Sequence, residues 1–132
     1  MFIGICYIFS HNLTKGRVSA SGADYAEWFE KEGDTIMPGD IIGLDAKTGR
    51  ARKYIEGDVL LGICSAKPGF VGDKPDNKTD DELEITHILV ALVGKLRVNK
   101  GMVNILGREV RTKDGNFVGY ILSDGRVLIK MK

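Results

Sequence analysis

Residues 88–93 read Ile88-Leu89-Val90-Ala91-Leu92-Val93, with no polar residue at any position. A strand with one wet face alternates apolar and polar residues, so this run predicts a strand that is covered on both faces. Either the strand lies between two layers of one domain, or another subunit covers its outer face. Because the other elements that the sequence predicts are short, we interpret the run as a subunit contact. The residues predicted to make this contact are Ile88, Val90 and Leu92.

The rest of the chain predicts an all-β fold. Its 17 glycines separate short apolar segments, as is typical of a domain of strands and turns. Pro38-Gly39-Asp40 fits a type II turn, and Asp114-Gly115 and Asp124-Gly125 fit hairpin turns. We expect a barrel or sandwich of short antiparallel strands. The expected strands cover residues 2–9, 17–20, 40–44, 51–55, 59–66, 83–98, 102–105, 109–112, 117–122 and 126–131.

Size, charge and motifs exclude several functions. With 132 residues the chain is long enough for one domain with its own core. The net charge of +1 provides no basic surface for nucleic acid, and no metal-binding or nucleotide-binding motif is present. We therefore expect no cofactor, no metal and no nucleic-acid partner. Cys6 and Cys64 lie in apolar runs without metal-ligand spacing, so we expect buried free thiols, with a disulfide between them as the alternative.

The N-terminus is apolar from Phe2 to Phe9. This stretch is shorter than the roughly 20 residues that span a bilayer, and it lacks the basic start and cleavage site of a signal peptide. We expect residues 1–20 to form an apolar strand or arm, exchanged with a neighbouring subunit, and residues 21–132 to form a single β-domain. An unpaired strand edge invites pairing with another chain. The contact residues predicted in this arm are Phe2, Ile5, Tyr7, Ile8 and Phe9.

Residues 67–82 interrupt the pattern of short strands. They contain Pro68, Gly69, Gly72 and Pro75 and are otherwise largely polar. We expect a long surface loop, and loops of this length are uncommon without a purpose. The loop is either an exposed excursion or a segment that contacts a partner or a small ligand.

Residues 21–30 hold the candidate chemistry and read Ser-Gly-Ala-Asp-Tyr-Ala-Glu-Trp-Phe-Glu. Asp24 and Glu27 fit the N-cap and N3 positions of a short helix near residues 25–31. Such a helix would place both carboxylates on one face. In a strand, residues three apart point to opposite faces, so the carboxylates would meet only through a bend or across two copies of the chain.

The stretch from Ala23 to Glu30 resembles the Ala-Asp-Tyr-Ala-Glu-aromatic-Phe-Glu signature of the peptidase G2 family. These are the autoproteolytic intramolecular-chaperone domains at the C-terminus of phage neck-appendage and tail-spike proteins. Gly33-Asp34, Pro38-Gly39-Asp40, the stretch 58–68 and the stretch 93–98 are also similar to that family. The resemblance covers the chain from about residue 20 to its C-terminus.

The resemblance implies a trimerising β-domain that assists the assembly of a fibre and then cuts itself off. The bond that is cut would be the one between Ala23 and Asp24. Asp24 and Glu27 would be the catalytic carboxylates, one acting as base or nucleophile and the other protonating the leaving amide nitrogen. Such a reaction requires no metal and no cofactor.

Two departures from the family favour a different use of the domain. Ala23 stands where the best-known members have Ser, and only 23 residues precede Asp24. We therefore expect a self-assembling structural subunit of an oligomer, fibre or tube, located in a virion or an extracellular assembly. The alternative is an autoproteolytic intramolecular chaperone that trimerises and cleaves before Asp24. A small ligand-binding β-barrel is a second alternative.

Overall fold

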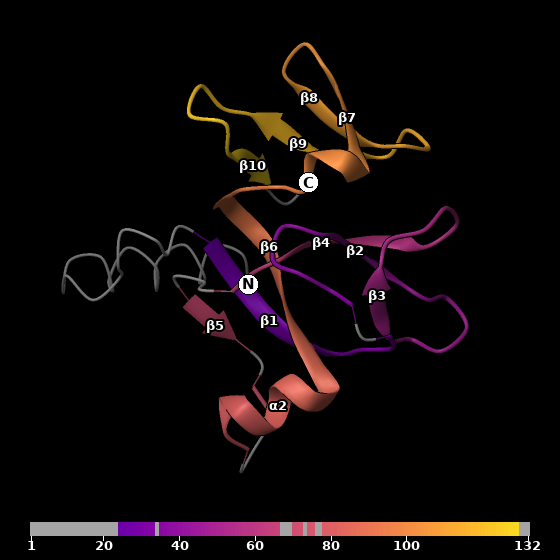
Figure 1. The fold of residues 1–132 in the computed structure, drawn as a ribbon, viewed down its shortest axis with the longest axis vertical. Helices are drawn as coiled ribbons and strands as arrows, with labels where there is room; N and C mark the ends of the chain where they lie inside the picture. Colours follow the sequence, from indigo (N-terminus) through magenta and orange to yellow (C-terminus); the bar gives the residue numbers. More distant parts are fainter. Residues whose placement is uncertain (1–23, 34, 67–69, 73, 76–77, 130–132) are drawn as a thin grey trace, which may run out of the picture.

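The computed structural model describes residues 24–33, 35–66, 70–72, 74–75 and 78–129. These residues form a mostly antiparallel, curled sheet that closes into a half-barrel (Figure 1). The all-β prediction is confirmed. The strands are β1 (Asp24–Glu30), β2 (Ile41–Leu44), β3 (Ala51–Lys53), β4 (Val59–Cys64), β5 (Phe70–Gly72), β6 (His87–Leu96), β7 (Val103–Leu106), β8 (Glu109–Thr112), β9 (Phe117–Ile121) and β10 (Val127–Ile129).

Strand β6 is the centre of the sheet. One of its edges pairs antiparallel with β1 along the whole of β1. Its other edge is shared, because Val90 and Ala91 pair with β4 whereas residues 94–96 pair with β10. The extra residue of a bulge, Leu92, lies between these two stretches, since Val93 pairs with Tyr25 and Ala91 with the next residue of β1. We call this place, β6 residues 91–94, the fork.

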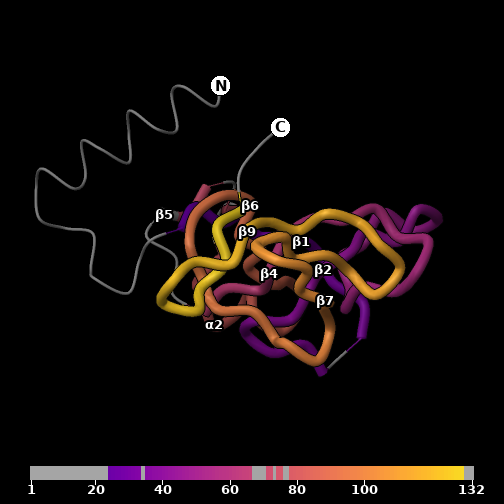
Figure 2. Tube along the Cα trace, turned by 90° about the horizontal axis from the view of Figure 1, so that it is seen from above, coloured from indigo at the N-terminus to yellow at the C-terminus, as the bar shows by residue number. Residues whose placement is uncertain are grey.

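The sheet splits at the fork into two lobes. The β2–β4 lobe has the strand order β3-β2-β4, and the β7–β10 lobe has the order β10-β9-β8-β7. Seen from above, the β7–β10 lobe overlies β2 and β4 (Figure 2). An inner cluster of buried side chains from both lobes and from β1 and β6 fills the space between them. Its members are Ala26, Ile41, Ile63, Ala91, Val98, Val103, Val110, Val118, Val127 and Ile129.

The other face of β6 is covered within the same chain. Ile88 and Val90 are 7% and 0% exposed, and they pack in a second cluster with Ile42, Ala51 and Cys64. Leu92 is half-buried against this cluster. The interpretation of Ile88 and Val90 as a subunit contact is therefore corrected, whereas that of Leu92 stays a prediction. The apolar run is a strand between two layers of one domain, the first of the two alternatives.

The predicted helix near residues 25–31 is wrong. The stretch forms β1, because Tyr25, Trp28 and Phe29 favour a strand and β6 and β5 offer edges on both sides of it. The one α-helix among the described residues is α2 (Asp80–Thr86), where the expected strand 83–98 would begin. A capping box starts this helix, since Thr79 and Glu82 each accept a hydrogen bond from the other's backbone N–H.

The segment 67–82 is also not one long loop. Its described part contains β5, which pairs in parallel with β1, and the first turn of α2. A short 3-10 turn, η1 (Lys100–Met102), precedes β7. The expected strands 2–9 and 17–20, and the arm contacts at Phe2, Ile5, Tyr7, Ile8 and Phe9, lie outside the described residues.

Close packing at the fork predicts the effect of one substitution. A Cβ added to Gly62 would overlap the carbonyl oxygen of Ala91 on β6. We expect Gly62→Ala to lower the free energy of unfolding by about 2–3 kcal/mol, because the two strands must separate to admit the methyl group. Gly101→Ala is the matched control, since its nearest neighbour is a side-chain oxygen at 3.3 Å, and it should change stability by less than about 1 kcal/mol. Urea unfolding measures both, and equal effects would contradict the close approach of the strands.

Candidate functional site

Strand β1 places the two candidate catalytic carboxylates on opposite faces. Asp24 shares the inner face with Ala26 and Trp28, and Glu27 shares the outer face with Tyr25, because side chains alternate along a strand. Asp24 is 3% exposed. Glu27 is half-buried, and its Oε2 accepts a hydrogen bond of 2.5 Å from the Tyr25 hydroxyl. The strand therefore directs the two side chains away from each other.

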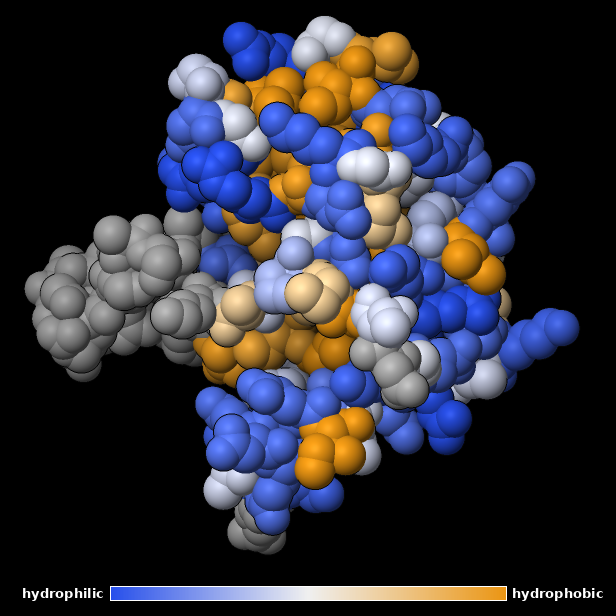
Figure 3. Space-filling view, viewed as in Figure 1, coloured by the Kyte–Doolittle hydropathy of each residue, from blue (hydrophilic) through white to orange (hydrophobic). Residues whose placement is uncertain are grey.

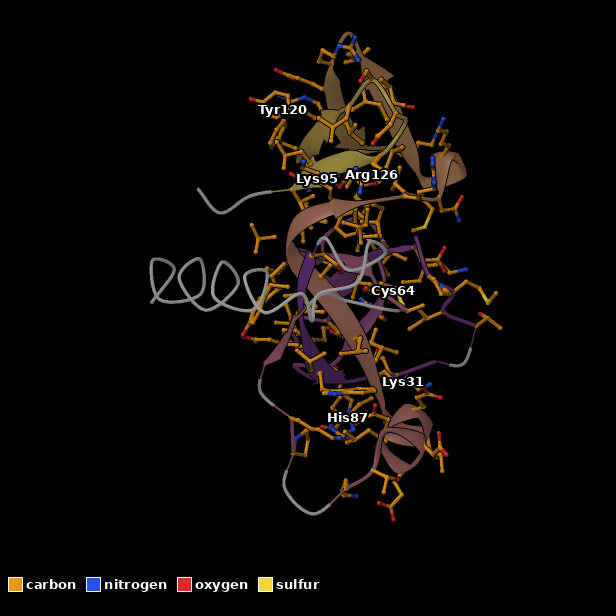
Figure 4. All side chains as sticks on the ribbon, turned by 90° about the vertical axis from the view of Figure 1, so that its left-hand side faces the viewer. Lys31, Cys64, His87, Lys95, Tyr120 and Arg126 are labelled. Carbon is orange, nitrogen blue, oxygen red and sulfur yellow. The ribbon has the colours of Figure 1, made fainter. Side chains whose placement is uncertain are left out.

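Asp24 lines a hollow of about 770 Å³ at the end of β6. Lys95 and Arg126 lie on this side of the molecule, close to each other, with Cys64 further along (Figure 4). Four cations and two carboxylates line the hollow, which gives it a formal charge of +2. These charged residues are Asp24, Asp40, Lys53, Lys95, Arg97 and Arg126.

Asp40, in the turn before β2, has a structural role in this hollow. Its Oδ2 accepts from the Met37 N–H at 2.9 Å, and its Oδ1 accepts from Asn99 Nδ2 at 2.9 Å. Lys53 Nζ lies 3.6 Å from Oδ2. The carboxylate thus joins the turn to the chain after β6, across 59 residues of sequence. Each of its oxygens accepts a hydrogen bond that holds the turn in place.

The cations of the hollow differ in how firmly they are held. Both Nε and Nη2 of Arg126 lie 2.9 Å from Asp124 Oδ2, and the backbone N–H and then the guanidinium of Arg126 lower the pKa of Asp124. Arg97 reaches only the carbonyl of Asp124, at 3.5 Å. Lys95 is exposed and makes no hydrogen bond or ion pair within the described part of the chain. Lys95 is thus the cation that can meet an incoming negative charge most directly.

Cys64, at the end of β4, is a buried free thiol. Burial, and then the nearby Asp40 carboxylate, raise its pKa to about 11. The thiolate is the nucleophilic form, so this residue is unreactive near neutral pH. The prediction of a buried free thiol is confirmed for Cys64, whereas Cys6 lies outside the described residues.

A second charged cluster surrounds Arg52 on β3. Its guanidinium binds Asp58 through two hydrogen bonds of 3.0 and 2.6 Å, and its Nη1 lies 3.2 Å from Glu32 and 3.3 Å from Asp45. Hydrogen bonds from the backbone N–H of Lys47, with Arg52 adding to the effect, lower the pKa of Asp45. The cluster fixes the turns around β3. Across the described ranges no group of three or more His, Cys, Asp or Glu side chains is arranged so that it could hold a metal ion.

No protein-family model, curated protein or solved structure matches this chain. The resemblance to the peptidase G2 family therefore stays a prediction. The described part of the chain contains no helix with the length and apolar character needed to cross a membrane.

The sequence pointed to Asp24 but not to its surroundings. The hollow is lined by Lys53, Lys95 and Arg126, which come from three separate strands or turns. No spacing in the sequence indicates that these residues lie near one another. The sequence predicts the Pro38-Gly39-Asp40 turn. It does not predict that Asn99 binds Asp40, because the sheet topology brings these two residues together.

Cys64 makes the free energy of unfolding depend on pH in the alkaline range. The folded-state pKa lies above the ordinary value of 9.0, at about 11, so the unfolded thiol loses its proton first. The stabilising contribution is complete below pH 9 and is lost as the pH rises toward 11, by roughly 2–3 kcal/mol. Urea unfolding at intervals from pH 8 to 11 measures this decline. Cys64→Val, which keeps an apolar side chain, should decline less over the same range, and parallel declines would contradict the assignment.

Proposed function

We propose that this chain is a self-assembling structural subunit that associates with copies of itself through an open sheet edge. The supporting observation is β7, the last strand of the β7–β10 lobe. It pairs with β8 at all four positions without a bulge, and no described strand pairs with its other edge. Ile105 and Leu106 on this strand are 41% and 64% exposed. A regular, uncharged and apolar edge is a template for pairing with another chain.

The β3 end of the same path of strands is protected. Lys31 forms a bridge with Ala51, and the Glu32 N–H donates to the Ala51 carbonyl at 2.9 Å. Arg52 and Lys53 add charge to this strand. Charged residues and covering segments are the usual means by which proteins block an edge. Among the described residues β7 has neither a charged side chain of its own nor a covering segment, and this contrast favours β7 as an interface.

The outer face next to β7 has the composition of a contact surface. Leu106, Glu109 and Tyr120 lie side by side across three strands, and Arg111 stacks 5.6 Å above the ring of Phe117. Apolar atoms lie among charged ones over the upper part of the molecule, where this lobe is found (Figure 3). Tyr, Phe and Arg are enriched at protein interfaces. Antiparallel pairing of β7 with a second β7 about Ile105 would bring two such faces together.

A charge on β7 should weaken association. We expect Leu106→Lys to raise the concentration of half-association by about tenfold or more, because the interface loses an apolar contact and gains a desolvated charge. Ile85→Lys is the matched control, since Ile85 on α2 is 77% exposed and lies on no strand edge. Light scattering across a concentration series measures the mass of both variants. A monomer at every concentration in the unmodified protein would refute the proposed function.

Autoproteolysis before Asp24 is the second candidate function, and the position of Asp24 favours it. The carboxyl is buried at the start of β1 and faces a hollow with a net positive charge. Positive groups next to a scissile peptide stabilise the negative charge that develops on its carbonyl oxygen. Glu27 lies on the opposite face, and Asp40, the other carboxylate of the hollow, is hydrogen-bonded to Met37 and Asn99, so we expect the Glu27 that acts with Asp24 to come from another copy of the chain. Cleavage would then require assembly.

A mixing experiment tests cleavage across copies. Intact-mass measurement should find a fragment that begins at Asp24, and Asp24→Asn or Glu27→Gln alone should abolish it, because each removes one of the two carboxylates. When the two variants are mixed and reassembled, a fraction of sites combines native Asp24 and native Glu27, and cleavage should return. Glu30→Gln, an exposed glutamate of the same strand, should cleave like the unmodified protein. Failure of the mixture to cleave would exclude a pair shared between copies.

A further inference from the structure

A cleft opens at the fork, between the two lobes and beside the inner cluster. It has a volume of about 510 Å³, and β4 forms one wall from Val59 to Gly62. Phe117 and Val118 of β9 form the opposite wall, and Leu92, the bulged residue of β6, contributes to its lining. Apart from Asp58 and Asn116, the side chains that line it are apolar.

The β4 wall is an unpaired strand edge. Strand β4 pairs with β2 along most of its length, but it pairs with β6 only at Ile63 and Cys64. Gly62 still lies against Ala91. Beyond the fork β6 pairs with β10 instead, so residues 59–61 have no partner strand on this side among the described residues. Val59 is 53% exposed here. Backbone donors and acceptors beside apolar side chains are best satisfied by another strand.

We infer that this cleft binds the apolar segment Phe2–Phe9 of a second copy of the chain, added as a strand to the free edge of β4. The inference rests on the proposed self-association and adds a second contact surface to the β7 edge. Phe2–Phe9 contains no charged residue and is rich in Phe, Ile and Tyr, which favour strands. Its chemistry matches the apolar walls, and its backbone supplies the hydrogen bonds that the β4 edge lacks.

The length of chain before Asp24 allows the arm to leave its own sheet. Asp24 pairs with Gly94 on the edge of β6 that faces away from β4 and β10. The linking residues 10–23 extend at most about 50 Å, so the arm is not confined to the strands beside Asp24. The proposed self-association then favours the cleft of a second copy. Two copies can then exchange arms reciprocally.

The native thiol of Cys6, in the middle of the arm, provides a test in the full-length chain. Val59→Cys and Asn116→Cys each place a thiol on one wall of the cleft, and Ile85→Cys places one on the exposed face of α2 as the control. We expect mild oxidation to link Cys6 to either wall position between chains, giving covalent dimers on a non-reducing gel. The yield should exceed that of Ile85→Cys by about tenfold or more, because docking raises the effective concentration of the thiols. Adding Cys6→Ser should abolish the link.

The other outcomes separate this inference from the proposed function. A disulfide from Cys6 to position 59 or 116 in a monomeric band would show that the arm folds onto its own chain, and would overturn the second-copy assignment. Oligomers that form in solution without either link would overturn the cleft as the docking surface but leave self-association intact. A single mass of one chain at all concentrations would overturn both. Circular dichroism and the midpoint of urea unfolding verify that each variant is folded.

Discussion

The structure depends on one strand whose two faces and two edges are all in use. Ala91 of β6 faces the inner cluster and Val90 faces the second cluster, and both are fully buried. The same strand pairs with β1 on one edge and with β4 and β10 on the other. A ten-residue strand cannot hold two antiparallel partners along the same stretch of one edge. Strand β6 therefore pairs with β4 along one stretch and with β10 along the next, and the bulge at Leu92 lies between the two stretches.

The fork leaves the two lobes without backbone hydrogen bonds between β4 and β10, so other contacts hold them together. The Tyr54 hydroxyl donates to Asp114 at 2.9 Å and accepts from Asn116 Nδ2 at 2.6 Å, which joins the end of β3 to the β8–β9 turn. A hydrogen bond from the Thr112 hydroxyl, and then the bond from Tyr54, lower the pKa of Asp114. Together with the inner cluster, these bonds hold the two lobes together beside the cleft, which Asn116 also lines.

The sequence predicts the strands whose signals are local and misses those that depend on partners. Strand β8 has the predicted bounds, because the turn at Gly107 and the one at Asp114-Gly115 delimit it. The stretch that forms β1 also fits a helix by sequence, because Asp24 and Glu27 have the spacing of an N-cap and N3 pair. Its pairing with β6 decides its conformation. For the same reason the sequence does not show which residues cover Ile88 and Val90. Periodicity shows that both faces are apolar, but only the topology shows what lies against them.

The position of the two carboxylates links chemistry to assembly. A strand fixes Asp24 and Glu27 on opposite faces, and the Tyr25 hydroxyl holds Glu27 on its own side. If cleavage occurs, this geometry favours the Glu27 of a neighbouring copy over the Glu27 of the same β1 as the partner of Asp24. A reaction that needs a carboxylate from a neighbour is silent in a free subunit and begins only when copies meet. Self-association and self-cleavage are then successive consequences of one geometry, and a chain whose copies associate without aligning these residues would remain an uncut building block.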